Sequence, residues 1–186
     1  MKPALIVIDI QNDYFPGGKM ELEGSPEASL QAAKLLERFR STGLPLVHIQ
    51  HVSNRPGASF FLPDTEGVNI HANVAPRAGE IVLQKNFPNS FRGTPLLEQL
   101  RGLGVDHLVI AGMMTHMCVD STTRAAFDLG FSCSLAHDAC ATRALAFGEM
   151  RVPAAQVHAS FLAALNGLYA KVQSTAAIVA ETGVRS

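Results

Sequence analysis

The chain has 186 residues, 47% of them hydrophobic and 17% charged, with a formal net charge of −1 at neutral pH. This length and composition predict one compact α/β domain over residues 1–186, with a sizeable core. The balanced charge argues against a nucleic-acid partner, and no apolar run approaches the roughly 18 residues that span a bilayer.

The N-terminal segment reads as a strand rather than a targeting signal. It places Asp9 at the end of an apolar run and lacks a signal-peptide cleavage pattern. Three cysteines occur, Cys118, Cys133 and Cys140, without C-x-x-C spacing. An odd number of unspaced cysteines is typical of reduced thiols, so we expect a cytoplasmic protein with no disulfide framework.

Apolar runs and helical patterns alternate along the chain. The expected strands, in chain order, are Ala4–Ile10, Pro45–His51, Ile81–Gln84, His107–Gly112, Phe131–Ala136 and, more weakly marked, Ala170–Val172. The expected helices are Pro26–Ser41, Thr94–Leu103, Cys118–Leu129, Pro153–Leu168 and Thr175–Glu181. Continuously apolar strands, each preceded by a helix that ends at a glycine, are typical of βαβ units. The pattern therefore predicts a doubly wound, mainly parallel six-stranded sheet with helices on both faces, a Rossmann-like fold.

The segment Ser53–Gly79 does not fit this alternation. It is polar, rich in proline, glycine and asparagine, and contains the adjacent Phe60 and Phe61. A loop of this length in a compact domain is often functional, so it is expected to be a lid or a subunit contact. An ordinary surface loop with its aromatic side chains tucked inward remains the alternative.

Three reactive side chains stand at or beyond strand ends. Asp9 closes the first strand, Lys85 closes the third, and Cys118 follows the fourth. The carboxyl ends of parallel strands share one edge of a sheet, so the topology brings the three together where α/β proteins bind ligands. Each residue alone also has an ordinary structural explanation. Asp9 could form a turn, Lys85 could be solvated, and Cys118 could be a small buried hydrophobic residue. Together they suit nucleophilic catalysis, because a carboxylate can take the thiol proton and an ammonium can stabilise the resulting charge.

The position of Cys118 also predicts its reactivity. It opens the expected helix Cys118–Leu129. Free backbone N–H groups and the positive end of the helix dipole favour a thiolate, so we expect a lowered pKa for this thiol.

Several segments of the chain resemble the isochorismatase-like family of cysteine hydrolases, which includes nicotinamidases and N-carbamoylsarcosine amidohydrolases. The matching stretches are Ala4–Asp13, Gln84–Thr94 and Gly112–Val119, extended by Arg124–Gly130 and by Asp138 with Ala139. They occur in family order and cover nearly the whole chain, so the combination is specific.

The resemblance implies a catalytic triad of Asp9, Lys85 and Cys118. It also implies a cis peptide bond between Met113 and Met114, and an oxyanion hole formed by the backbone N–H groups of Met114 and Cys118. Cys118 would attack a carbonyl carbon and form a thioester, with Asp9 as the proton acceptor. The expected reaction is hydrolysis of a small amide, ureido or related acyl compound.

The metal site of nicotinamidases is not matched. Those relatives carry an Asp-x-His pair and a further His after the second strand, where this chain has His51 and Ser53. His48 and His51 are three apart and fall on opposite faces of a strand, and His71 stands alone. No metal or other cofactor is therefore expected, and nicotinamidase activity is in doubt.

A small-molecule pocket is expected around the triad. Its proposed lining comprises Asn12, Phe15, Phe60, Phe61, Phe91, Thr115 and His116, with Gln11 and Ser90 supporting it from behind. Core packing is the alternative for each phenylalanine. Met114 is bulky where many relatives have a small residue, so it is expected to narrow the pocket.

The remaining histidines and cysteines are not expected to take part in the chemistry. His116 is expected to line the pocket rather than act as a base, and His137 and His158 are expected to be structural or interface residues. Cys133 is expected to be buried, and Cys140 is expected to lie in a loop where it could be exposed.

Three other possibilities remain open. One is an isochorismatase-type hydrolase that cleaves a vinyl ether without needing the thiol. Another is a non-catalytic, small-molecule-binding Rossmann-like module, although no G-x-G-x-x-G loop follows the first strand. A third is an oligomeric scaffold without activity. Relatives are commonly dimers or tetramers, so a homodimer or homotetramer is expected.

Overall fold

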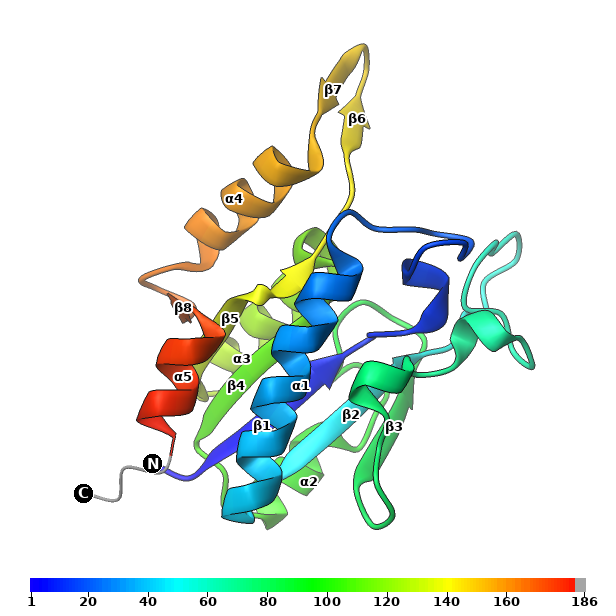
Figure 1. Cartoon of the computed structure of the whole chain (residues 1–186). Helices are drawn as coiled ribbons and strands as arrows, with labels where there is room; N and C mark the ends of the chain where they lie inside the picture. The colour runs from blue at the N-terminus through cyan, green and yellow to red at the C-terminus, as the bar shows by residue number, and fades with distance from the viewer. Residues whose placement is uncertain (183–186) are drawn as a thin grey trace.

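The computed structural model describes residues 1–182 and is built on a six-stranded sheet. Its strand order is β3-β2-β1-β4-β5-β8, and every neighbouring pair is parallel (Figure 1). The strands are β1 (Pro3–Ile8), β2 (Leu46–His51), β3 (Ile81–Lys85), β4 (His107–Met113), β5 (Ser132–Ala141) and β8 (Lys171–Gln173). This arrangement confirms the predicted doubly wound α/β fold.

Helices cover both faces of the sheet (Figure 1). They are α1 (Ser25–Thr42), α2 (Leu96–Gly102), α3 (Asp120–Asp128), α4 (Ala154–Leu165) and α5 (Thr175–Glu181). Helices α1 and α5 pack into one apolar core, and α2, α3 and α4 pack into the other. Strand β1 feeds both cores, with Leu5 and Val7 on the α1 side and Ile6 and Ile8 on the opposite side. Burial on both faces explains why the strands are continuously apolar in sequence.

The long segment between β2 and β3 is folded onto the body of the protein. It contains two short 3-10 helices, Glu66–Val68 and Ala72–Val74. Asp13, just beyond β1, accepts a hydrogen bond from the Phe61 N–H at 2.6 Å, and Gln11 forms an isolated β-bridge with Ile70. The segment is therefore anchored to the residues that follow β1.

Strand β5 is longer than the sequence suggests. The prediction ended at Ala136, whereas the strand runs to Ala141 after a register shift between Ile110 and Gly112 of β4. The shift lets Cys140 pair with Gly112, and Cys140 is buried. The expectation that Cys140 lies in a loop was wrong, whereas Cys133 is buried as expected.

An antiparallel hairpin, β6 (Leu145–Phe147) with β7 (Met150–Val152), was not predicted. It projects from the body of the molecule between β5 and α4 (Figure 1). Phe147 is 88% exposed and Met150 is 67% exposed. We refer to Leu145–Val152 as the arm.

The start of the third helix also differs from the prediction. Residues Thr115–Val119 form one turn of π-helix, and α3 begins only at Asp120. Cys118 therefore lies inside an irregular turn between β4 and α3. No helix within residues 1–182 is both long enough and apolar enough to cross a bilayer.

Candidate active site

Four polar side chains meet at the carboxyl edge of the sheet. Asp9 follows β1, His51 ends β2, Lys85 ends β3, and Cys118 lies in the turn after β4. Strands β1 and β4 are the neighbours at which the strand order reverses, the place where α/β sheets bind ligands. The structure thus brings together the three reactive side chains singled out from the sequence, and adds His51.

The Lys85 ammonium lies at the centre of this group. Its Nζ is 2.7 Å from Asp9 Oδ2, 3.0 Å from His51 Nδ1, 3.0 Å from the Phe87 carbonyl oxygen and 3.3 Å from Cys118 Sγ. Asp9, Lys85 and Cys118 are all buried, with at most 4% of each residue exposed. Because these side chains are buried away from solvent, water screens the interaction of the ammonium charge with its neighbours only weakly.

Burial raises the pKa of the Cys118 thiol well above its usual range, and the negative charge of Asp9 raises it further. Lys85 opposes this rise without cancelling it. The lowered pKa expected from the sequence was therefore wrong, because Cys118 lies within a buried π-turn beside a carboxylate. Burial also disfavours the Lys85 ammonium, but Asp9 and Cys118 outweigh it and raise the pKa of Lys85. The resting site thus holds a neutral thiol beside a carboxylate–ammonium pair.

The backbone at Asp9 is held in an unusual conformation. Its φ of 51° lies in the left-handed region, which a non-glycine residue occupies at a cost of about 1–2 kcal/mol. Its N–H donates to Ile49 O at 3.0 Å, which fixes the residue against β2. Within the described residues, Asp9 Oδ1 is buried and has no hydrogen-bond partner. A carboxylate oxygen is thus left available next to the thiol.

The turn after β4 brings the backbone close to the site. The Met113–Met114 peptide bond is cis, at the position that the family resemblance implied. Gly112 has φ of 140°, and a Cβ there would lie 2.1 Å from Ile8 O, so only glycine fits between β1 and β4. Met114 is buried and packs into the core on the α1 side.

His51 is the member of the site that the sequence did not reveal. Burial lowers its pKa to about 4, and the Lys85 charge contributes to that shift. Gln11, predicted to support the site, clamps the His51 backbone: its Nε2 donates to His51 O at 2.9 Å, and its Oε1 accepts from His51 N at 2.7 Å. The only signal in the sequence was the position of His51 at a strand end.

The donor atoms of Asp9, His51 and Cys118 lie within 4.8 Å of one another, a spacing that a metal ion could bridge. The Lys85 ammonium already contacts all three. A cation held among the donors opposes a second one by charge repulsion, so this set fits a protonated lysine better than a metal. His48 is bonded to Glu80, and His71 stacks on Phe15, so neither joins the cluster.

The predicted aromatic lining is divided between two regions. Phe60 and Phe61 pack against Tyr14, with ring centroids 6.0 and 4.5 Å away. Phe15 is buried against His71, with ring centroids 3.6 Å apart. Phe91 lies in the opposite core beside Phe131. The sequence named Phe15, whereas Tyr14 is the neighbouring aromatic whose pKa responds to the charges of Cys118 and Asp9.

The predicted polar lining is engaged in internal hydrogen bonds. Asn12 donates to Glu66 O at 3.0 Å, Thr115 bonds Ala141 O and the His158 ring, and His116 bonds Thr142. Ser90 bonds Thr122 of α3 and so ties the segment after Lys85 to that helix. These contacts hold the surrounding backbone in place, and the supporting role expected for Ser90 and Gln11 stays a prediction.

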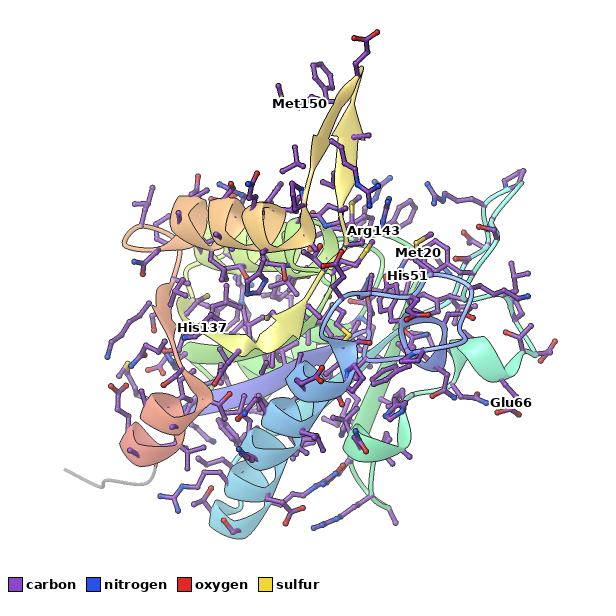
Figure 2. The ribbon with its side chains drawn as sticks, turned by 45° about the horizontal axis from the view of Figure 1, so that its top comes forward. Met20, His51, Glu66, His137, Arg143 and Met150 are labelled. Atoms are coloured by element: carbon purple, nitrogen blue, oxygen red, sulfur yellow. The ribbon has the colours of Figure 1, made fainter. Side chains whose placement is uncertain are left out.

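Arg143 is a further cation near the site that the sequence did not reveal. It follows Thr142 at the foot of the arm (Figure 2 labels it together with His51). Its positive charge opposes the rise in the pKa of Tyr14 and contributes to the lowered pKa of His116, so it lies near both. Among residues 1–182 its buried Nε has no hydrogen-bond partner.

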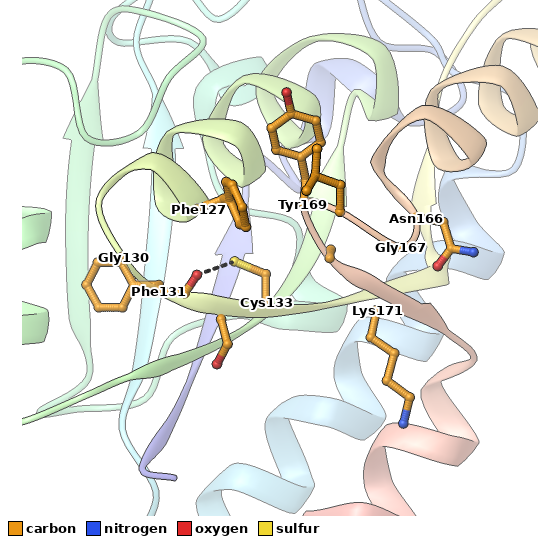
Figure 3. Close-up of a pocket in the computed structure, with 11 residues that line it drawn as sticks. Phe127, Gly130, Phe131, Cys133, Asn166, Gly167, Tyr169 and Lys171 are labelled. Atoms are coloured by element: carbon orange, nitrogen blue, oxygen red, sulfur yellow. Dashed lines mark hydrogen bonds between the residues drawn. The ribbon is translucent and has the colours of Figure 1, made fainter.

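One cavity, of about 560 Å³, lies away from these residues. Phe127, Phe131, Cys133 and Tyr169 line it (Figure 3). It sits at the amino ends of β5 and β8, the edge opposite to the Lys85 cluster. Ligands of open α/β sheets bind at the carboxyl edge, so this cavity is not the candidate active site.

The sequence and the fold of this chain are similar to those of known proteins. A family model described as "Isochorismatase domain" matches residues 3–177. The chain is 51% identical to the isochorismatase family protein YddQ of Bacillus subtilis (strain 168), over 96% of this chain and 99% of that protein. It is 34% identical to the maleamate amidohydrolase of Pseudomonas putida, over 70% of this chain and 68% of that one. It also superposes on a crystal structure from Oleispira antarctica with a TM-score of 0.92 and 50% identity, covering 96% of each chain.

Proposed function

Because the chain belongs to the isochorismatase family and is a hydrolase, we propose that it cleaves a C–N bond in a small amide or ureide through a covalent Cys118 intermediate. One observation carries this proposal. Lys85 Nζ contacts both the Asp9 carboxylate, at 2.7 Å, and the Cys118 sulfur, at 3.3 Å, in a buried site. A nucleophile, a proton acceptor and a charge stabiliser are thereby combined.

In the first half-reaction, Asp9 accepts the thiol proton as Cys118 attacks the carbonyl carbon. The raised pKa of the thiol means that little thiolate exists at rest, so proton transfer accompanies the attack. Lys85 stabilises the charge that develops on sulfur. Asp9 then gives the proton to the leaving nitrogen, the C–N bond breaks, and a thioester remains on Cys118.

In the second half-reaction, Asp9 removes a proton from water. The hydroxide attacks the thioester carbonyl, the C–S bond breaks, and the proton returns to the Cys118 sulfur. The sum is amide plus water giving acid plus amine or ammonia. In both halves the negative carbonyl oxygen would be held by the N–H groups of Met114 and Cys118. In residues 1–182, the Met114 N–H makes no hydrogen bond to another residue that would compete with this role.

The substrate class follows from the charge near the site. Arg143 has a buried Nε without a partner among residues 1–182, and guanidinium groups suit carboxylates. Maleamate, named for one relative, carries a carboxylate beside its amide. We therefore expect a small amide or ureide that bears a carboxylate. Replacing Arg143 by Met should raise KM for acid amides by at least tenfold and leave neutral amides unaffected.

The test of the proposal is a panel of small amides, ureides, carbamoyl compounds and vinyl ethers, with release of ammonia, amine or enol product measured. Cys118→Ala should lose C–N cleavage, and the matched control Cys133→Ala, which removes a buried thiol on the opposite edge, should retain it. Acid quenching followed by intact-protein mass spectrometry should show the acyl adduct. Cleavage of a vinyl ether that survives Cys118→Ala would favour the alternative reaction. No turnover of any compound, with an unreactive Cys118, would favour a binding module or scaffold.

A further inference from the structure

Tyr14 carries a hydroxyl group that the described part of the chain leaves unused. The residue ends the short 3-10 turn Asn12–Tyr14 beyond Asp9 and is only 2% exposed. Its ring packs against Phe61 with the centroids 4.5 Å apart, so the aromatic part is held in place. Its hydroxyl makes no hydrogen bond to any of residues 1–182. Buried polar groups are nearly always bonded, so an unpaired hydroxyl in such a place calls for a partner outside the chain.

The Tyr14 hydroxyl stays protonated at neutral pH. Burial raises the pKa of Tyr14 well above its usual range, and the neighbouring Cys118 and Asp9 raise it further. Arg143 opposes the rise, and its effect is larger than that of Asp13, which is adjacent in sequence. A protonated phenol offers one O–H donor, so the group that it binds must be an acceptor.

Backbone hydrogen bonds hold Arg143 close to Tyr14. The Leu22 N–H donates to Tyr14 O at 3.0 Å, and the next residue, Glu23, donates its N–H to Thr142 O at 3.0 Å. Arg143 follows Thr142 directly. One short segment therefore ties the turn that ends at Tyr14 to the foot of the arm.

The foot of the arm is also tied to the turn that carries Cys118. The His116 ring, in that turn, bonds the Thr142 hydroxyl. Arg143 is the residue after this contact, and its buried Nε lacks a partner among the described residues. Two donors without partners, the neutral phenol of Tyr14 and the guanidinium of Arg143, thus border the candidate nucleophile.

A carboxylate is the group that satisfies both donors. It has two oxygens, so it can accept from a guanidinium and from a hydroxyl at the same time, and its charge balances that of the guanidinium. A neutral amide oxygen accepts a hydrogen bond but leaves the cation uncompensated.

We propose that the Tyr14 hydroxyl donates a hydrogen bond to the carboxylate of the substrate and forms, with Arg143, a two-donor subsite for acid amides. The inference rests on the proposed function, in which Arg143 alone recognises the carboxylate, and adds a neutral donor to it. Tyr14 is a specificity-determining residue in this account and takes no part in the proton transfers.

Binding without turnover tests this subsite, with Cys118→Ala as the parent protein. Succinamate and succinamide are the probes, because they have similar shapes and differ in one carboxylate charge. Tyr14→Phe, added to the parent, removes the hydroxyl and keeps the ring. Tyr169→Phe is the matched control, since it removes the hydroxyl of the other tyrosine, which lines the cavity at the opposite edge of the sheet.

Titrations followed by ligand-observed NMR should show that Tyr14→Phe raises the Kd of succinamate at least about tenfold, as for loss of a hydrogen bond to a charged group. The Kd of succinamide should stay within about twofold, because no charged acceptor is present. Tyr169→Phe should change neither value. Without a ligand, Tyr14→Phe should melt at the temperature of its parent or above it, because an unpaired buried hydroxyl contributes no stability.

Unchanged succinamate binding in Tyr14→Phe would overturn the proposal, as would an equal loss of succinamide binding. A clear fall in the melting temperature of Tyr14→Phe would assign the hydroxyl a structural role and overturn it as well. A parent that binds no succinamate would have the same consequence. The titrations need no catalysis, so the subsite can be present when C–N cleavage by Cys118 fails, and cleavage can occur when the subsite is absent.

Discussion

At the scale of single residues, the candidate site depends on one buried ion pair. Asp9 and Lys85 are both at most 1% exposed, and their charged atoms are 2.7 Å apart. Removing one partner of such a pair leaves the other as an uncompensated buried charge, which commonly costs about 3–5 kcal/mol.

We therefore predict that Lys85→Met lowers the free energy of unfolding by about 3–5 kcal/mol. Adding Asp9→Asn should recover part of the loss, because the stranded carboxylate is then gone. Lys171→Met, which removes an exposed ion pair to Glu181, is the control and should have little effect. Urea unfolding of wild type, Lys85→Met, Asp9→Asn and the double variant gives the coupling energy of the pair. A double variant less stable than Lys85→Met would contradict this account.

Met114 is a second residue whose effect can be measured directly. It is 5% exposed, follows the cis bond and has a thioether larger than the side chains expected at this position. Met114→Ala should lower stability by about 2–5 kcal/mol, as for other buried methionines. It should also admit bulkier amides, changing the ratio of kcat/KM between small and large substrates. The same ratio in wild type and variant would show that Met114 does not shape the pocket.

At the scale of elements, the approach of β4 to β1 depends on Gly112. A Cβ there would lie 2.1 Å from Ile8 O and 2.8 Å from the Ile8 carbonyl carbon, both backbone atoms that cannot move aside independently. We predict that Gly112→Ala pushes β4 from β1 and disturbs Asp9 and Cys118 together. Activity should fall at least a hundredfold with loss of stability. Gly102→Ala, where nothing lies within 4 Å of an added Cβ, is the matched control and should be nearly silent.

The elements also show what could be predicted from sequence. All six strands of the sheet and the helices between them were predictable from the sequence. Burial on both faces leaves continuous apolar runs in the strands, and glycines follow several of the helices. The edge position of Asp9, Lys85 and Cys118 followed from that topology. The contact between His51 and Lys85 depends on the β2–β3 register, which no local pattern encodes. The π-turn at Cys118 and the burial of its thiol depend on the packing of surrounding residues. The strands of the arm are too short to show a recognisable alternation of apolar and polar residues.

At the scale of the whole molecule, the arm bears on association. Phe147 and Met150 are exposed on a two-stranded hairpin, and an isolated hairpin is marginally stable in water. The family resemblance leads us to expect a homodimer or homotetramer. Light scattering after size exclusion should give a multiple of the 19.9 kDa chain mass. Phe147→Ser should shift it toward monomer, and Leu30→Ser, at an exposed position on α1, should not. A monomer at high concentration would contradict this expectation.

The histidines should make the stability of the whole protein depend on pH. Six of the seven, His48, His51, His71, His107, His116 and His158, have a pKa lowered by burial. As the pH falls below about 6.5, these histidines become protonated in the unfolded chain but stay neutral in the folded protein. The free energy of unfolding therefore decreases. For His51 the decrease continues to about pH 4, where the folded protein also binds the proton.

Melting temperatures should therefore be level between about pH 7.5 and pH 8 and fall steadily from pH 6.5 to pH 5. Glu80, with a pKa lowered to about 2 chiefly by its hydrogen bond to Arg40, contributes stability that is lost only below about pH 4.5, so it does not overlap this window. His51→Asn removes one of the six groups and should make the fall less steep. A melting temperature that is level or rising as the pH drops from 7.5 to 5 would contradict the lowered pKa values of these imidazoles.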